Sequence, residues 1–146
     1  MSRILGIDEL WPTCIVIVEG KQSLEQHIQM IKIWDDWLGK KEAFHILRYY
    51  HDAHSLEQTP GVAKATKSWL RAGAQDKIKE YISSMQIVVP LESYDNVKQL
   101  SVERVFSVSG GIYASLDEAI KMIYTHDPSP SHLPEDVLSL IASEFT

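Results

Sequence analysis

Cysteine is nearly absent from this chain: Cys14, inside the apolar run CIVIV, is the only one among 146 residues. A single thiol excludes an internal disulfide and a metal cage built from several thiolates. It is also typical of a protein that works in a reducing compartment. The sequence therefore predicts a cytoplasmic protein.

Long apolar runs are missing as well. No stretch approaches the roughly 20 residues that a helix needs to cross a bilayer, and no apolar segment follows a basic start. We therefore expect no stable membrane insertion and no cleaved leader. Basic residues are in the minority, since 14 Lys and Arg stand against 20 Asp and Glu, which gives a formal net charge of -6. Because phosphate backbones attract basic faces, general binding to nucleic acid is disfavoured.

The signatures of common enzyme sites are also lacking. The chain has no Gly-x-Ser-x-Gly elbow, and Ser109-Gly110-Gly111 lacks the lysine and the length of a phosphate-binding Walker loop. No internal repeat or low-complexity tract appears. We expect no enzymatic activity, no cofactor and no bound metal ion.

The clearest pattern that is present is a strand over residues 43–52, AFHILRYYHD, followed by a polar loop and a helix. Bulky side chains occupy both alternating sets of this strand, which is typical of a strand covered on both faces in the middle of a sheet. Open α/β sheets bind ligands beyond the carboxyl ends of their strands. We therefore expect any site at the loop that follows this strand.

Short strands and helices alternate along the rest of the chain. Further strands are predicted over residues 3–7, 14–18, 85–89 and 112–114, the first two as a hairpin. Helices are predicted over residues 23–39, 59–82, 94–108, 115–124 and, after a loop with three prolines, 134–145.

Three local signals set the limits of these helices. Thr59, followed by Pro60, is predicted as the N-cap of the second long helix. Gly73 is expected to weaken the middle of that helix by about 1 kcal/mol relative to alanine. The segment 94–108 fits either a helix or a strand, and Gly110-Gly111, taken as a left-handed stop, favours the helix.

Three pieces of the chain, KSWLRAG, IVVP and IYASLDEAIKMI, resemble the bacterial SpoIIAA-like STAS/SEC14 proteins. The order of predicted elements is similar to that of STAS domains, the modules of sulfate transporters and anti-sigma-factor antagonists. The resemblance implies an α/β fold of STAS type: a mixed sheet of about five strands, with helices mainly on one face. Residues 1–125 then form the STAS-like domain, and residues 126–146 form a proline-containing linker and an extra C-terminal helix.

The function implied by this resemblance is non-enzymatic, regulated binding of a protein partner. Antagonist STAS domains carry a phosphorylatable serine, in an Asp-Ser-Ser/Thr-Gly pattern, where the central strand meets the next helix. This chain departs from the pattern, because Asp52 is followed by Ala53. The candidate partner-binding or switch residues are therefore Asp52, His54, Ser55 and Thr59. Ser55 and Thr59 are displaced phosphorylation candidates, although Thr59 also fits a helix cap and Ser55 a solvated loop.

Aromatic residues offer an alternative function. A pocket between the sheet and the helices for a flat or lipid-like ligand would make the protein a carrier or sensor. The aromatic residues that fit its lining are Trp34, Tyr49 and Trp69, together with Trp37 and Tyr50. The same side chains also fit a plain core. His51, Asp52 and His54 are metal-ligating types, but a tight loop rarely turns three neighbours onto one ion, so exposed loop histidines are the favoured interpretation.

Charge is unevenly distributed between two helices. The outer face of the 59–82 helix is mostly basic, whereas residues from 126 onward contain four acidic residues and neither lysine nor arginine. Such a tail could cover that helix or reach a second subunit. The sequence therefore leaves a homodimer open.

Overall fold

The computed structural model describes residues 2–127 and 132–145, and its centre is a five-stranded sheet in the order β1-β2-β3-β4-β5. The strands are β1 (Arg3–Ile7), β2 (Thr13–Glu19), β3 (Phe44–Tyr50), β4 (Ile82–Val88) and β5 (Gly110–Tyr113). β1 runs antiparallel to β2, and the other neighbours are parallel. The predicted α/β class and mixed sheet are confirmed, and the strand predicted to be central lies in the middle.

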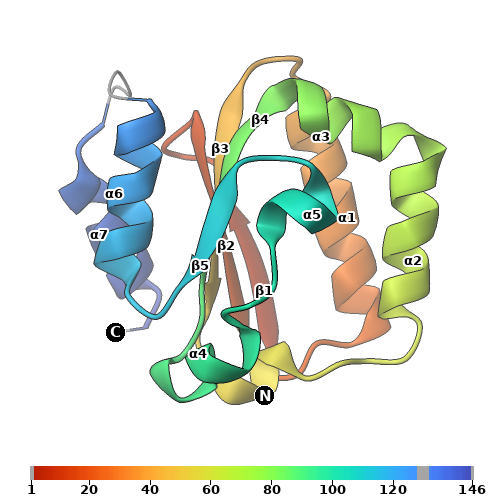
Figure 1. Ribbon diagram of the computed structural model, residues 1–146, viewed down its shortest axis with the longest axis horizontal. Coiled ribbons are helices and arrows are strands. Elements are labelled where there is room, and N and C mark those ends of the chain that lie inside the picture. Colours follow the sequence, from red (N-terminus) through yellow and green to blue (C-terminus); the bar gives the residue numbers. More distant parts are fainter. Residues whose placement is uncertain (1, 128–131, 146) are drawn as a thin grey trace.

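Helices cover both faces of this sheet (Figure 1). They are α1 (Leu24–Leu38), α2 (Val62–Trp69), α3 (Gln75–Tyr81), α4 (Leu91–Val97), α5 (Val102–Phe106), α6 (Leu116–His126) and α7 (Pro134–Ser143). A short 3-10 helix, η1 (Ala53–Leu56), follows β3, and a π-helical segment, η2 (Leu70–Ala74), joins α2 to α3. The middle of the predicted three-proline loop, residues 128–131, lies outside the described residues.

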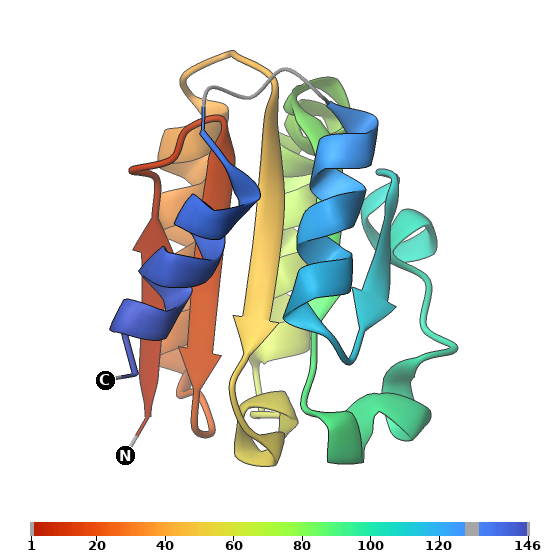
Figure 2. The ribbon, with the colours of Figure 1, turned by 90° about the vertical axis from the view of Figure 1, so that its left-hand side faces the viewer.

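The strand order explains where the helices lie. Every parallel crossover steps to the next strand in the same direction, and such connections are right-handed in nearly all proteins. α1, α2, α3 and α5 therefore share one face, whereas α6 and α7, which follow the last strand, cover the other (Figure 2). The first face buries Trp34, Trp37 and Phe44, and the second buries Leu47 and Ile120.

The second long helix differs from its prediction at its start and in its middle. Thr59 does not cap it, because the Thr59 hydroxyl donates to the carbonyl of Gln22 and Gly61 is the N-cap. Gly73 does more than weaken the helix: it adopts a φ of 127°, which a residue with a side chain rarely takes. The predicted single helix is therefore two, α2 and α3, joined by a kink.

The segment after β4 also differs from its prediction. Residues 94–108 do not form one helix, because α4 ends at Val97 and Ser101 caps a separate α5 by accepting from the amide of Arg104. Gly110 and Gly111 are not the left-handed stop; Ser107 has that conformation, with φ 61°. Instead Gly110 opens β5, where a Cβ would stand 1.9 Å from the carbonyl oxygen of Met85. The glycine is needed for close approach of β5 to β4.

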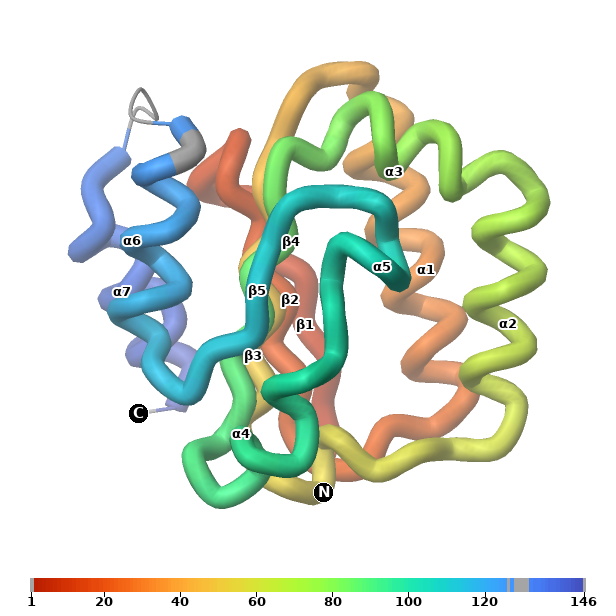
Figure 3. The backbone as a smooth tube through the Cα atoms, viewed as in Figure 1, coloured from red at the N-terminus to blue at the C-terminus, as the bar shows by residue number. Residues whose placement is uncertain are grey.

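The C-terminal helix does not cover the basic helix. α7 packs on the opposite face of the sheet from α2 and α3 (Figure 3), where Val137 and Ile141 are buried in the same core as Ile15. Its end is joined to β1, because the Arg3 guanidinium donates to a carboxylate oxygen of Glu144 at 3.1 Å and to its backbone carbonyl at 3.0 Å. Of the two arrangements considered from the sequence, cover of the basic helix by the tail of the same chain is therefore wrong, and contact with a second subunit stays a prediction.

Candidate functional site: a cavity beside the central strand

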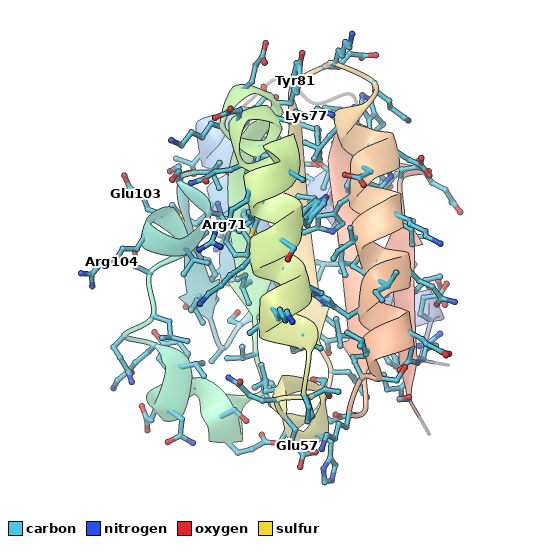
Figure 4. The ribbon with its side chains drawn as sticks, turned by 90° about the vertical axis from the view of Figure 1, so that its right-hand side faces the viewer. Glu57, Arg71, Lys77, Tyr81, Glu103 and Arg104 are labelled. Carbon is cyan, nitrogen blue, oxygen red and sulfur yellow. The ribbon has the colours of Figure 1, made fainter. Side chains whose placement is uncertain are left out.

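A cavity of about 320 Å³ lies between the sheet and helices α1 and α2, and the loop after β3 borders one end of it. Figure 4 views this face, with α1 and α2 side by side in front of the sheet. The apolar part of the lining comprises Ile4, Val18, Met30, Ile31, Trp34, Leu56, Val62, Ala63, Trp69 and Phe106. Such a volume lies at the lower end of the range for small-molecule sites, about 300–1,000 Å³.

Two tryptophans form the aromatic wall of the cavity. Trp34 follows Met30 by one helical turn, so both side chains face the sheet, and Trp34 is only 4 % exposed. Trp69 meets Trp34 edge-on, with ring centroids 5.8 Å apart, and its indole nitrogen donates to an Asp35 carboxylate oxygen at 2.7 Å. The ring centroid of Phe106, in α5, lies 6.3 Å from that of Trp34. The cavity thus includes Trp34 and Trp69 of the aromatic residues proposed from the sequence.

Tyr49 does not line the cavity. Successive side chains of a strand point to opposite faces, so Tyr50 faces the cavity and Tyr49 faces α7. The Tyr49 ring lies 5.8 Å from the ring of Phe145, and burial raises the pKa of the Tyr49 hydroxyl. Of the two neighbouring tyrosines proposed for the pocket, Tyr50 therefore lines the cavity and Tyr49 does not.

Arg48 is a charged cavity residue that inspection of the sequence missed. It belongs to the same alternating set of β3 as Phe44 and Ile46, which are fully buried. Its guanidinium carbon lies 5.8 Å from the Trp34 ring centroid and 5.3 Å from that of Tyr50. Arg48 takes part in none of the ion pairs that the described residues form. The signal that could have identified Arg48 is a charged residue among the alternate residues of β3 that face the core.

His27 links the two helices over the cavity. Its Nε2 lies 2.8 Å from the Thr66 hydroxyl, which itself donates to the carbonyl of Val62 at 3.0 Å. Because the hydroxyl hydrogen is used in that bond, Nε2 must be the donor to Thr66. Burial, and then the charge of Arg48, lower the pKa of His27, so the imidazole is neutral at pH 7.

The loop predicted to bind a partner forms the rim of the cavity. The Asp52 carboxylate accepts from the amide of Ser55 at 2.9 Å and from the amide of Gly20 at 3.1 and 3.2 Å. Ser55 and Thr59 line the cavity. Ser55 is only 5 % exposed and its hydroxyl donates to the carbonyl of Asp52, so the solvated Ser55 considered from the sequence is wrong. His54 is the exposed member of the set.

The three potential metal ligands of this loop point to different neighbours. The His51 ring stacks on Phe145 at 4.0 Å, Asp52 caps η1, and His54 lies 3.0 Å from a Glu57 oxygen. Within residues 2–127 and 132–145, no three His, Cys, Asp or Glu side chains gather as a metal site.

A second group of polar side chains lies on the opposite face, under the segment between α6 and α7. His45 Nδ1 is 2.7 Å from the Ser84 hydroxyl, and His45 Nε2 is 3.5 Å from an Asp127 oxygen. A hydrolytic triad joins the same three residue types, but there the serine contacts Nε2 and the carboxylate contacts Nδ1, so the two ring nitrogens of His45 have exchanged partners. Ser84 is also fully buried, and His132 bonds Thr13 beside it, so the group ties the segment to the sheet.

Comparisons with known proteins leave the site to be interpreted from its geometry. A scan against protein-family models, a search of curated proteins and a search of solved structures return no match. In the part of the chain that the structure describes, none of the helices is both long and apolar enough to span a bilayer.

Proposed function

We propose that this protein is a small-molecule carrier or sensor that binds its ligand in the cavity between the sheet and helices α1 and α2. One observation carries the proposal: the lining combines an aromatic wall, Trp34 and Trp69, with Arg48, a cation that forms no ion pair with the described residues. Sites for small ligands typically combine apolar walls with a few convergent polar groups.

The position of the cavity in the fold supports the same function. Arg48 and Tyr50 come from the carboxyl end of the central strand, and the loop that follows closes one side. Open α/β sheets bind ligands at this end of their strands. The STAS-type assignment is a proposal too, supported by the hairpin at the start, the central β3 and the closing helix capped by Ser115.

A matched pair of variants tests the proposal. Ala63 lines the cavity and is exposed on α2, so Ala63→Trp places an indole at the opening without enlarging the core. Ser68→Trp puts the same side chain on α2 at an exposed position outside the lining. Each protein is incubated with a small-molecule extract of its host cells, passed through a desalting column and weighed by native mass spectrometry.

We expect an added nonprotein mass on the wild type and on Ser68→Trp, and its loss from Ala63→Trp. Spectra that show only the bare chain for all three proteins would contradict ligand binding. An added mass that survives in Ala63→Trp would place the ligand elsewhere.

Regulated binding of a protein partner is the second candidate function. The observation that favours it is the exposed apolar surface of the segment after β4, where Leu91 is 77 % and Leu100 is 59 % exposed. α4 lies at the same end of the sheet as η1 (Figure 2), so this surface adjoins the loop of Asp52 and His54. A pull-down from the host cell tests this function. Recovery of less partner by both Leu91→Asp and His54→Ala, each folded as the wild type, would support partner binding; recovery equal to that of the wild type would contradict it.

A further inference from the structure

The positive charge of the cavity comes from one side chain. Arg48 is the one permanent cation among the described lining residues, and no carboxylate of the described chain pairs with it. It stands on the inner face of the central strand, against the rings of Trp34 and Tyr50. Arg48 is half-buried, and a partly buried guanidinium is stabilised by an anion beside it. An anionic group of the ligand fits this place.

The neighbouring groups limit that anion to a single charge. His27 is neutral at pH 7, because burial and the charge of Arg48 lower its pKa, so it adds no second positive charge. Glu57, the carboxylate in the lining, lies at the exposed rim, where it pairs with His54. A second negative charge on the ligand would find no further cation in the described lining, and it would be repelled by the carboxylate of Glu57. This arrangement favours a carboxylate over a phosphate monoester.

Unused donors lie at the same wall. Arg48 Nε and Trp34 Nε1 are both buried and have no hydrogen-bond partner among the described residues. Both residues line the cavity. Unsatisfied buried donors are unfavourable, and a carboxylate brings two strong acceptor oxygens. Arg48 Nε and Trp34 Nε1 are enclosed by protein atoms, so an anion in the cavity meets the terminal guanidinium nitrogens of Arg48, which are not among the buried atoms without a partner.

The remaining walls set the size and shape of the ligand. Beyond Arg48 the cavity is bounded by the rings of Trp34, Trp69 and Phe106. Aromatic walls favour a flat or compact apolar body, and about 320 Å³ is small for a drug-sized molecule.

We propose that the cavity binds a small organic monoanion, with its carboxylate on Arg48 and its compact apolar body against Trp34 and Trp69. The inference rests on the proposed function, and it adds the chemical class of the ligand.

Three probes with the same ring and different heads test this class by isothermal titration calorimetry. They are 2-naphthoate, a monoanion; 2-naphthamide, its neutral counterpart; and 2-naphthyl phosphate, a dianion at pH 8. For the wild type we expect 2-naphthoate to bind at least about tenfold more tightly than either of the others, as a charge-assisted pair gives. This comparison requires no variant and no change in folding.

A charge-matched pair of variants then locates the anion. Arg48→Met removes the guanidinium and keeps much of the volume. Arg104→Met removes the same charge from an exposed position of α5, where the side chain points away from the cavity (Figure 4). We expect Arg48→Met to bind 2-naphthoate and 2-naphthamide equally, and Arg104→Met to retain the wild-type preference.

The outcomes separate the ligand class from the proposed function. Equal binding of 2-naphthoate and 2-naphthamide to the wild type, tighter binding of the phosphate, or a preference that persists in Arg48→Met overturns the monoanion. In each of those cases binding that Ala63→Trp abolishes still supports a ligand cavity. If none of the probes binds the wild type, the monoanion class is overturned, and the native mass measurement alone decides whether the cavity binds a ligand.

Discussion

Arg48 occupies a position at which its strand otherwise carries core residues. Phe44 and Ile46, in the same alternating set, are almost entirely buried. The charged residue within a core set is visible in the sequence. Its neighbour is not, because Trp34 belongs to α1 and the alternation of residues along β3 does not show which helix packs against Arg48. Trp34 and Trp69 could be proposed as a pocket because large aromatics recur on two helices. Of the two tyrosines proposed with them, only Tyr50 lies on the cavity side of β3.

At the same scale, His27 should make the protein sensitive to acid. Its folded-state pKa lies below 6.5, so the unfolded chain binds more protons as pH falls below that value. The stabilising contribution is present in full above pH 6.5 and is lost as pH falls towards the folded-state pKa.

We expect His27→Gln to lose less stability than the wild type between pH 7.5 and 5, measured as the free energy of unfolding in urea. His54→Gln is the control, because that side chain is 78 % exposed. His132, whose pKa burial also lowers, is present in all three proteins. Parallel pH profiles for His27→Gln and the wild type would contradict the prediction.

Gly110 gives a prediction about close packing. A methyl group there would stand 1.9 Å from the Met85 carbonyl oxygen, and backbone cannot move aside as a side chain can. We expect Gly110→Ala to lower the free energy of unfolding by about 3 kcal/mol, the upper end for overpacking.

Gly39→Ala is the matched control. Gly39 has φ -66°, an ordinary helical value, and an added Cβ would come no closer than 3.2 Å to the Asp35 carbonyl oxygen. We expect its stability to stay within about 0.5 kcal/mol of the wild type. Equal losses for the two variants in urea unfolding would show that β5 can shift away from β4.

The helices that could be predicted from the sequence are those with both an N-cap residue and apolar residues at regular helical spacing. The Ser23 hydroxyl accepts from the amide of Gln26, whose side chain accepts from the amide of Ser23, and Ser115 caps α6 as expected. Residues 91–106 were not predictable as two helices, because the apolar spacing continues across the break. Ser101, which caps α5, was the local signal.

Gly73 gives a prediction for the kink between α2 and α3. Its φ of 127° is strained for any residue with a side chain, and a Cβ there would meet nothing within 4 Å. The cost of Gly73→Ala is therefore one of backbone conformation alone, about 1–3 kcal/mol. Urea unfolding measures the free energy of unfolding of Gly73→Ala. Ala72→Gly, a change at the neighbouring position of the same segment, is measured in the same way for comparison.

A stability of Gly73→Ala at or above that of the wild type would show that residues 62–81 can straighten into the single helix that the sequence predicts. In that case Trp69 would turn relative to Trp34, and the near-ultraviolet circular dichroism of the tryptophans would change as well.

For the whole molecule, the second face of the sheet depends on the end of the chain. Ile141 of α7 is 2 % exposed and packs in the same core as Ile15 and Leu47. We expect Ile141→Ala to lower the free energy of unfolding by about 2–4 kcal/mol in one cooperative transition. Ser139→Ala, on the exposed side of α7, should change it by less than about 0.5 kcal/mol.

Unfolding of Ile141→Ala in two steps, with α7 lost first and the rest unchanged, would instead show that residues 132–145 are an independent appendage. The fluorescence of the tryptophans reports the first face, and far-ultraviolet circular dichroism reports all helices. Unfolding curves that coincide for the two signals indicate one cooperative transition, and curves that separate indicate an independent α7.

The sequential strand order also governs how the protein emerges during synthesis. Every strand after β1 leaves the ribosome when its hydrogen-bonding neighbour has already been made, so the sheet can extend one strand at a time. α6 and α7 are made after all five strands. Until then the face that carries Ile15, Ile17 and Leu47 has no cover, and the nascent chain presents an apolar surface to the cell.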